Sequence, residues 1–446
     1  MHFDRSIFKA YDIRGTVPDQ LTSEIAYRIG NSLAGFLKPK SIAVGRDMRV
    51  SSDEMFDALS AGILDRGTDV VDLGMVSTDA LYFAVGRYGY DGGIMITASH
   101  NPGHYNGFKV CGKDAVPLSG SEGLDIVAAD VAADRVEKYS SRGTIIRKDV
   151  GRDFAEHVLS FIDPTAIKPF RIVIDAGNGM AGATLAPVFE KLPCKVTPLY
   201  FEPDGNFPNH IPNPIEAKNL IELQKTMAAQ KADLGAAFDG DADRMFLLDR
   251  TGTPLGGDMV TALVADNILT RSPNETILYN LICSRAVPEL ITRKGGKAIR
   301  TRVGHAIIKP LMKKHNAVFG GEHSGHFYFR DNWFADSGLI ALMVCLELLS
   351  RADRDLTDLL KTIDAYVRSG EINSRVTSID QKIEEVAAAF SDGDADRLDG
   401  LTVQYHDWWF NLRPSNTEPL LRLNVEAANR ELLNGKVEQI VKIIRS

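Results

Sequence analysis

The chain has 446 residues, which is more than the roughly 250–300 at which a single hydrophobic core stops growing, so we expect several domains. Its apolar content of 44% and charged content of 25% are typical of a globular protein in water, and they exclude a disordered or membrane-embedded chain. The formal net charge of −8 argues against a general affinity for nucleic acid.

The cysteines and the start of the chain indicate a cytoplasmic protein. Cysteines occur at positions 111, 194, 283 and 345 without the spacing of metal ligands, so we expect reduced thiols. The first residues carry charge at once and lack the apolar stretch and cleavage site of a signal peptide. The longest apolar run, 339–349, contains Glu347 and is too short to span a membrane.

The first segment alternates strands and helices. The residue patterns predict an amphipathic helix over 22–36, a strand over 41–47, a helix over 52–66 and a strand over 69–74. Strand, helix and strand at this spacing are typical of a sheet covered by helices on both faces.

The next predicted strand, 94–96, ends abruptly in the polar loop TASHNP at 97–102, which presents Ser99 beside His100. A lone pair of this kind is more often a surface turn whose serine satisfies backbone groups. Ligands of such sheets, however, bind at the carboxyl ends of strands, where Ser99 should lie. Together with the acidic and phosphate-type loops described below, this position makes Ser99 a candidate phosphoryl carrier.

The same alternation begins again at two later points. A strand at 171–175 runs into a glycine-rich turn and a helix, and a strand at 276–281 opens a third block that includes 297–305. No strict sequence repeat accompanies this similarity of pattern. From about residue 372 onward the strands and helices are shorter, which indicates a smaller α+β domain that closes with a helix at 430–444.

We therefore predict an α/β protein with three similar mixed-sheet α/β domains and a smaller C-terminal α+β domain. The expected domains are 1–147 with the serine loop, 148–250 with an acidic loop, 251–366 with a histidine loop, and 367–446 with a phosphate-type loop.

The acidic loop, DGDADR at 239–244, lies between two apolar runs that we expect to be strands. Its carboxylates stand at alternate positions, Asp239, Asp241 and Asp243, so their oxygens can converge on one hard cation. A solvated acidic turn or half of a calcium loop would use the same residue types, but the calcium version lacks the bidentate glutamate downstream. Three protein oxygens leave positions for water and a phosphate oxygen, which favours Mg²⁺ in a phosphoryl-transfer site, with Arg244 at its rim to neutralise phosphate charge.

The same hexapeptide occurs again at 392–397. This copy follows a helical run at 383–390 and not a buried strand, and a polar turn separates it from the next strand. We interpret it as an exposed acidic connector without a metal.

Two further polar loops follow predicted strands. GGEHSGH at 320–326 offers a glutamate, a serine and histidines, which suit hydrogen bonds to sugar hydroxyls, although His323 can equally belong to a turn that points away. RPSNTEP at 413–419 offers a forked arginine donor together with neutral donors, and this mixture suits a phosphate monoester.

These motifs, TASHNP, DGDADR, GEHSGH and RPSNTEP in that order, resemble those of the α-D-phosphohexomutase superfamily. The resemblance spans essentially the whole chain, because each motif falls in a different predicted domain. It is closest to the phosphomannomutase/phosphoglucomutase branch. Phosphoglucosamine mutases usually have Gly-Thr where this chain has Asn416-Thr417, and Gln where it has His323.

The resemblance implies four domains around one central cleft. It implies that Ser99 is phosphorylated in the active enzyme and binds Mg²⁺ together with Asp239, Asp241 and Asp243. The catalytic set that it implies consists of Ser99, His100, Lys109, Arg14 and Arg244, with Lys109 and His100 as proton-transfer groups.

The resemblance also implies contacts for the sugar and its second phosphate. The implied substrate-binding residues are Tyr11, His305, Glu322, Ser324, His326, Arg413, Ser415, Asn416 and Thr417, of which the last four hold the phosphate that is not reacting. One departure concerns the segment Leu281-Ile282-Cys283, where family members often carry a basic residue. Part of the substrate contact is therefore missing there or supplied by another group.

The expected activity is that of a phosphomannomutase, which interconverts mannose 6-phosphate and mannose 1-phosphate and also acts on glucose phosphates. The phosphoryl group has to move between O6 and O1, which lie on opposite sides of the sugar ring. We therefore expect a hexose 1,6-bisphosphate that turns over in the cleft between two transfers with Ser99. The alternatives are a phosphoglucosamine mutase and a phosphatase that uses the same serine and metal. The expected partners are small sugar phosphates, one Mg²⁺ per chain and the bisphosphate as activator, with no nucleic acid or membrane, in a monomer or dimer.

Overall fold

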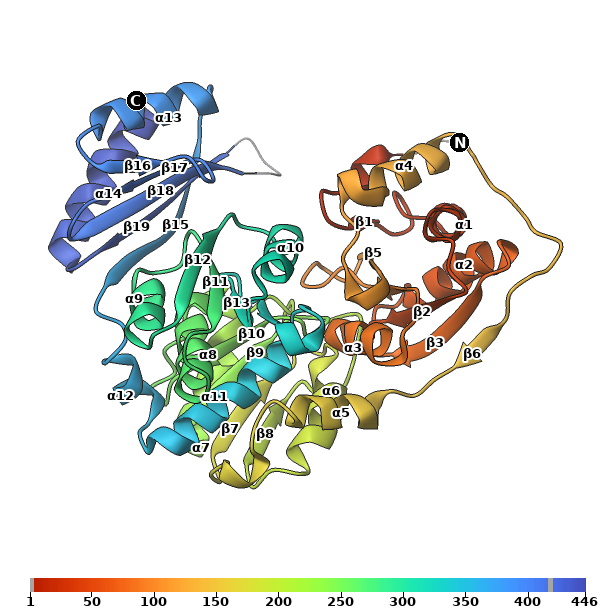
Figure 1. The fold of residues 1–446 in the computed structure, drawn as a ribbon, viewed down its shortest axis with the longest axis horizontal. Coiled ribbons are helices and arrows are strands. Elements are labelled where there is room, and N and C mark those ends of the chain that lie inside the picture. Colours follow the sequence, from red (N-terminus) through yellow and green to blue (C-terminus); the bar gives the residue numbers. More distant parts are fainter. Residues whose placement is uncertain (1–3, 416–419) are drawn as a thin grey trace.

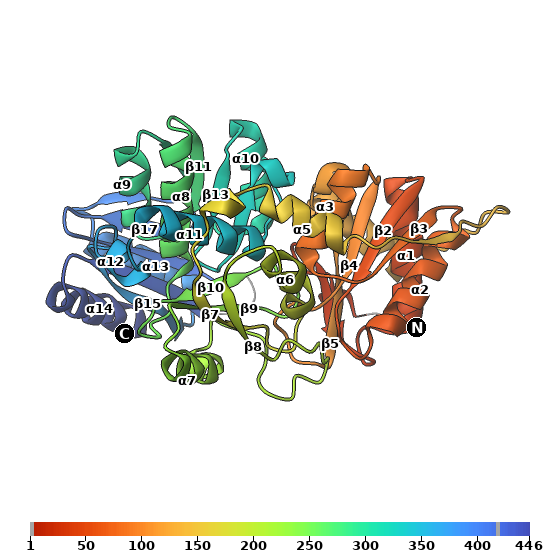
Figure 2. The same ribbon diagram turned by 90° about the horizontal axis from the view of Figure 1, so that it is seen from below.

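A computed structural model describes residues 4–415 and 420–446, with the backbone alone at positions 121, 122, 305 and 306. The chain passes through four domains, and the first and the last lie at opposite ends of the molecule in two perpendicular views (Figures 1 and 2). The predicted fold class is confirmed, because three mixed α/β sheets precede an antiparallel C-terminal sheet. None of the helices among the described residues combines the length and apolar content needed to cross a bilayer.

Domain I contains a six-stranded sheet in the order β1-β5-β4-β2-β3-β6. Its strands are β1 (Ile13–Thr16), β2 (Ser41–Arg46), β3 (Asp69–Met75), β4 (Gly92–Ile96), β5 (Tyr105–Gly112) and β6 (Ile145–Arg147). Its helices are α1 (Ser23–Leu37), α2 (Ser52–Asp65), α3 (Thr78–Tyr88) and α4 (Asp125–Ala132). The first, second and fourth helices pack on one face of the sheet and α3 on the other.

The elements predicted over 22–74 are correct to within one residue. Thr22 caps α1 by accepting a 3.2 Å hydrogen bond from Ile25 N.

Domains II and III contain four-stranded sheets in the orders β10-β9-β7-β8 and β12-β11-β13-β14. Domain II comprises α5 (Gly151–Leu159), β7 (Arg171–Asp175), α6 (Ala181–Phe189), β8 (Lys195–Leu199), α7 (Ile221–Gln230), β9 (Leu234–Phe238) and β10 (Met245–Leu248). Domain III comprises α8 (Gly257–Arg271), β11 (Thr276–Asn280), α9 (Ala286–Arg293), β12 (Lys297–Thr301), α10 (His305–His315), β13 (Phe319–Gly321), β14 (Phe327–Phe329), α11 (Gly338–Ala352) and α12 (Leu356–Leu360).

The three α/β domains place their site loops at the same point of the fold. In each sheet a strand that is parallel to its neighbour is followed directly by an antiparallel strand. The serine loop connects β4 to β5, the acidic loop connects β9 to β10, and the histidine loop connects β13 to β14. The domains are therefore built alike, although the sequence shows no strict repeat.

Domains II and III share one hydrophobic core. Apolar side chains of β7 and β9 in domain II and of β11 and β13 in domain III belong to the same buried cluster, together with those of α8 and α11. Domain I has separate cores on the two faces of its sheet, and domain IV has its own. The middle of the molecule is therefore one packed unit that carries two of the site loops.

Domain IV is an antiparallel sheet in the order β15-β19-β18-β17-β16. Its elements are β15 (Val367–Arg375), α13 (Ile379–Ala389), β16 (Asp394–Asp396), β17 (Leu401–Gln404), β18 (Trp408–Pro414), β19 (Leu420–Ala427) and α14 (Arg430–Arg445). The second hexapeptide differs from our interpretation as a connector, because its centre forms the edge strand β16. Ala395 pairs with Val403 of the next strand, although the residues of β16 are not of the β-branched and aromatic types that favour strands.

Candidate active site

The loop after β4 holds Ser99 in a left-handed backbone conformation with φ 51°, which is uncommon for residues other than glycine. The residue is only 4% exposed, and its Oγ donates to Asp239 Oδ2 at 2.8 Å. Arg244 Nη2 donates to the same hydroxyl at 3.2 Å, and His100 Nδ1 lies 3.2 Å from it. The hydroxyl therefore has a carboxylate, a guanidinium and an imidazole within reach, which is the setting of an activated nucleophile.

A buried arginine that the sequence did not reveal supports the serine loop. Arg49 donates to four main-chain oxygens of the loop at 2.7–2.9 Å, those of Ser99, Asn101, Pro102 and Tyr105. Asp47 lies 3.1 Å from the Arg49 guanidinium, and neither side chain is exposed. The sequence could have indicated this role only by position, because Arg49 follows β2, which is paired with β4. The ion pair of Arg49 and Asp47 fixes the main chain that presents Ser99.

The acidic loop after β9 brings its three aspartates together. Ligand oxygens of Asp239, Asp241 and Asp243 lie within 4.8 Å of one another, and all three residues are buried. Lys109 Nζ donates to Asp241 Oδ2 at 2.6 Å and to Asp243 Oδ2 at 2.5 Å. The other oxygens of these two carboxylates, Asp241 Oδ1 and Asp243 Oδ1, are buried without a hydrogen-bond partner among the described residues. Because such oxygens are costly to bury unpaired, this donor set fits a hard divalent cation.

The two ends of the acidic loop differ in charge balance. Burial raises the pKa of the Asp239 carboxyl to about 6, although the Arg244 guanidinium acts in the opposite direction. Burial also favours the neutral form of Asp243, but Lys109, His326 and Arg244 together outweigh burial and lower the pKa of that carboxyl overall. The loop thus depends on neighbouring cations to remain ionised.

Lys109 and His100 have opposite protonation tendencies. Burial disfavours the charged form of Lys109, yet Asp241 and Asp243 raise the pKa of its amine well above the ordinary value. The Arg244 guanidinium and then burial hold the pKa of His100 far below its ordinary value. At neutral pH Lys109 is therefore an ammonium ion, and His100 is a neutral imidazole whose protonation the neighbouring Arg244 guanidinium disfavours.

The histidine loop after β13 begins with a buried carboxylate. Glu322 is 2% exposed, its Oε1 accepts from Gly304 N at 2.9 Å and its Oε2 accepts from Tyr328 Oη at 2.7 Å. One oxygen thus holds the turn that precedes α10, and the other binds Tyr328 of β14. Ser324 Oγ lies 3.1 Å from His326 Nδ1, so these two side chains form a polar pair.

The histidine loop lies directly against the acidic loop. Met245 N donates to Gly325 O at 3.3 Å, and His326 Nε2 lies 3.7 Å from Asp243 Oδ1. Asp336, which sequence reasoning missed, approaches the same His326 nitrogen at 3.9 Å. His323 lies on another side, where its Nδ1 is 3.8 Å from Asp258.

Three further predicted site residues lie in or near β1 and at the start of α10. Arg14 donates to Asn101 Oδ1 at 2.7 Å and to Asp12 Oδ2 at 2.5 Å, so it lies against the serine loop. Tyr11 lies beside the turn before α10, because a Cβ atom on Gly304 would be 3.2 Å from its hydroxyl. His305 is the first residue of α10, but its side chain lies outside the described part of the chain.

The phosphate-type loop of domain IV forms a separate cluster. Arg413 is 7% exposed and donates to Glu371 Oε2 at 2.8 Å. Arg422, which sequence reasoning missed, lies 3.5 Å from the same carboxylate and donates to Ser415 Oγ at 3.1 Å. Asn416 and Thr417 lie outside the described residues. Two arginines share the Glu371 carboxylate here, so this one acid does not balance both guanidinium charges.

The segment at 281–283 that lacks the expected basic residue is buried at Leu281 and Cys283, and Cys283 Sγ donates to Asn280 Oδ1 at 3.0 Å. Arg285, two residues beyond it, points to domain IV instead. Its guanidinium donates to the main-chain oxygens of Tyr405, His406 and Trp408 at 2.6–3.1 Å. This arginine connects two domains and is not available as a substitute.

Comparison with known proteins agrees with this arrangement over the whole chain. Models of the phosphoglucomutase/phosphomannomutase alpha/beta/alpha domains I, II and III match residues 5–135, 152–252 and 256–366, and the model of its C-terminal domain matches 371–443. The chain belongs to the phosphoglucomutase/phosphomannomutase family. Enzymes of this family are metal-dependent isomerases that move a phosphate within a sugar.

Individual relatives of this family are similar over nearly their full length. A phosphomannomutase of Escherichia coli is 38% identical over 450 residues, which are 98% of this chain and 99% of that protein. A phosphomannomutase of Vibrio cholerae is 39% identical over 455 residues, covering 98% of both chains. The crystal structure of a phosphoglucomutase/phosphomannomutase family protein from Burkholderia thailandensis superposes with a TM-score of 0.91 at 33% identity, covering 100% of this chain and 98% of that one.

Proposed function

We propose that this chain is a phosphomannomutase that interconverts mannose 6-phosphate and mannose 1-phosphate and also acts on the corresponding glucose phosphates. The observation that carries the proposal is the position of Ser99, whose hydroxyl meets Asp239 and Arg244 inside the acidic loop. The names of the relatives support the mannose assignment.

In this proposal Ser99 Oγ carries the phosphoryl group. The P–O bond to Oγ breaks as a free sugar hydroxyl attacks, and the product is a hexose 1,6-bisphosphate. The bisphosphate turns over and returns its other phosphate to Ser99. Arg244 and Arg14 flank the serine loop and stabilise negative charge on the group in transfer.

Asp239, Asp241 and Asp243 would hold Mg²⁺ together with the phosphoserine. When bound, this ion neutralises charge on the transferred phosphate. His100 at the serine loop and Lys109 beside the acidic loop are the two groups that we propose for transfer of the proton of the attacking hydroxyl. Lys109 bridges the carboxylates of Asp241 and Asp243 and supplies positive charge beside the acidic loop.

The sugar would be read by the histidine loop and its second phosphate by domain IV. Ser324 and His326 form a polar pair next to Asp243, which suits contacts to sugar hydroxyls. Glu322 and Tyr11 lie at the turn before α10, and His305 is the first residue of that helix, so we propose that these three complete the set. Arg413, Ser415, Asn416 and Thr417 would hold the phosphate that is not reacting, and the charge of Arg422 supports that role.

A cytoplasmic location suits the proposal, because the four cysteines of the described chain are free thiols. Sugar phosphates are the partners that we propose, with a hexose 1,6-bisphosphate as activator. We expect a monomer or a dimer.

The test is a coupled assay with mannose 1-phosphate, glucose 1-phosphate and glucosamine 1-phosphate side by side, with Mg²⁺, a trace of hexose 1,6-bisphosphate and a readout of free phosphate. Comparable turnover of the first two substrates with little free phosphate is the expected result. Preference for glucosamine 1-phosphate would overturn the assignment within the family, and dominant release of phosphate would overturn the reaction class.

A further inference from the structure

A cavity lies between domains I and III, at residues that belong to none of the four site loops. Its volume is about 710 Å³, which lies within the range of roughly 300–1,000 Å³ that is typical of small-molecule pockets. One wall is the segment 112–118 after β5, and the other consists of α10 and the segment 330–334. In both views α10 lies on the side of domain III that faces domain I (Figures 1 and 2).

The α10 wall of the cavity carries lysines with uncompensated charge. Lys313 and Lys314 are exposed and form no ion pair with any described residue. Lys309, one turn earlier, is buried and lies 2.7 Å from Asp336 Oδ1. Asp114 is the one acidic residue among the described residues that line the cavity. Lysines are favoured at the C-terminal end of any helix, so this charge indicates a ligand only together with the apolar part of the cavity.

The apolar part of the cavity is built from strained aromatic residues. Trp333 and Phe334 both line it, and both have left-handed backbone angles, with φ 53° and 59°. Asp114 and Ala115 on the facing wall have φ 58° and 54°. Bulky side chains rarely adopt this conformation, and it persists where the surrounding structure imposes it, often at ligand sites. Gly86 of α3 makes room for this arrangement, because a Cβ atom there would be 2.2 Å from the Trp333 ring.

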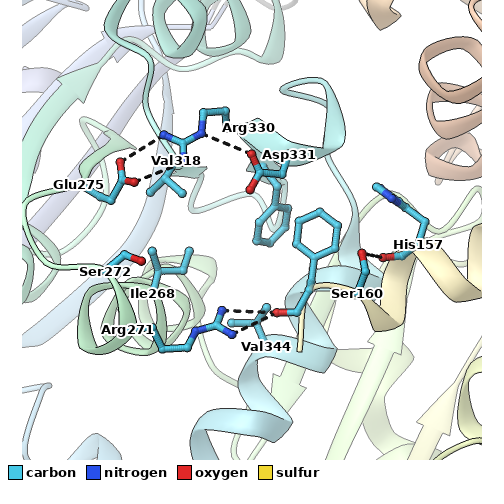
Figure 3. Close-up of a pocket in the computed structure, with 12 residues that line it drawn as sticks. His157, Ser160, Ile268, Arg271, Ser272, Glu275, Val318, Arg330, Asp331 and Val344 are labelled. Atoms are coloured by element: carbon cyan, nitrogen blue, oxygen red, sulfur yellow. Dashed lines mark hydrogen bonds and ion pairs between the residues drawn. The ribbon is translucent and has the colours of Figure 1, made fainter. Parts of the chain in front are cut away.

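A neighbouring cavity of about 450 Å³ serves as a comparison, because its charged side chains are paired with one another (Figure 3). There Arg330 pairs with Glu275 at 3.2 Å and with Asp331 at 3.4 Å. Arg271 donates to Phe161 O at 3.4 Å and lies 3.2 Å from Glu347. Its cations already have protein carboxylates as partners, so this pocket has no surplus charge with which to recognise an anion.

We propose that the cavity between the segment 112–118 and α10 is a binding site for a small organic anion with a flat apolar body. The apolar body lies against Trp333 and Phe334, and the anionic group lies at Lys313 and Lys314. Such a ligand contacts domains I and III at once. It also touches the helix whose first residue, His305, stands beside the proposed sugar site.

The probe that tests this site is 8-anilinonaphthalene-1-sulfonate, an aromatic sulfonate whose fluorescence rises in an apolar environment. We expect saturable binding to one site on the folded enzyme. The double variant Lys313→Glu/Lys314→Glu should weaken binding about tenfold, because two favourable charges become unfavourable. The control Lys195→Glu/Lys297→Glu makes the same change of net charge at exposed lysines away from the cavity and should bind the probe as the unmodified chain does.

Two further measurements locate the probe. Phe334→Ala should also weaken binding, whereas saturating mannose 1-phosphate should leave it unchanged. Equal affinity in the Lys313→Glu/Lys314→Glu variant, absence of saturable binding, or displacement of the probe by the sugar phosphate would each overturn the proposal. The two lysines are exposed, so their replacement tests binding without disturbing the fold.

Discussion

The chain contains the hexapeptide DGDADR twice, and the two copies have different structures. The copy at 239–244 connects two buried strands, and its three aspartates are 0–2% exposed. The copy at 392–397 contributes the edge strand β16, where Asp394 is exposed. Identical residues therefore form a cluster that requires cations in one place and a surface strand in the other.

The surroundings of the two copies explain the difference. Around the first copy, Lys109 comes from domain I and Arg244 folds back on Asp239, so buried carboxylates are balanced from two domains. In the second copy, Asp396 pairs with Arg300 of domain III, and Arg397 pairs with Glu384 at 2.8 Å on the surface. The flanking strands and the distant cations, and not the motif, determine which role the hexapeptide takes.

The largest effect on activity should come from replacing Ser99, whose hydroxyl donates a hydrogen bond to Asp239 of the first copy. Ser99→Ala removes the proposed carrier oxygen, so we expect turnover to fall by at least about 10³-fold, measured in the coupled mutase assay. Ser141→Ala, at an exposed serine of the same domain, is the control and should retain full activity. Residual activity of more than a few per cent in Ser99→Ala would show that Ser99 is not the carrier.

Matched aspartate variants compare the two copies directly. Asp241→Ala should reduce activity about 10²-fold or more and abolish its dependence on Mg²⁺, because a buried ligand oxygen is lost. Asp394→Ala should leave both unchanged, since its side chain is exposed. The measurement is the initial rate as a function of Mg²⁺ concentration. The opposite pattern would mean that the second copy, and not the first, binds the metal.

The arginines that end the two copies should differ in their effect on stability. Arg244 is buried beside Asp239, so Arg244→Ala leaves carboxylates uncompensated and should lower the melting temperature by about 6 °C or more in buffer without divalent ions. Arg397 forms a surface pair with Glu384, and Arg397→Ala should change the melting temperature by no more than about 1 °C. Equal shifts measured by differential scanning fluorimetry would contradict the contrast between the two copies.

Local elements of this fold could be predicted because their signals lie close together in the chain. Apolar runs bounded by turn residues located β2 and β3, and the amphipathic pattern located α1. The strands on both sides of the first hexapeptide were predicted in the same way. The pairing of β16 with β17 was not predicted, because Asp394 and Asp396 are residues that strands disfavour.

The parts of the site that escaped prediction depend on contacts between distant residues. Arg49 reaches four carbonyl groups of the serine loop from the segment after β2, and its role depends on the pairing of β2 with β4, which its local sequence does not reveal. Arg422 shares Glu371 with Arg413 because β15, β18 and β19 are neighbours in the sheet. The common core of domains II and III likewise arises from packing that no single segment encodes.

The smallest effect should come from the second copy itself. The pair between Asp396 and Arg300 joins domain IV to domain III, and its side chains are 34% and 24% exposed. Asp396→Ala should therefore destabilise this contact by less than about 1 kcal/mol. Because domain IV carries Arg413, we expect a rise of about twofold in KM for the sugar phosphate at low ionic strength, with kcat unchanged. At about 0.5 M salt, where the pair is screened, the variant and the unmodified chain should have the same KM. Asp394→Ala, two residues away and exposed, is the control. An unchanged KM in Asp396→Ala at low salt would show that this contact does not influence where domain IV holds the substrate phosphate.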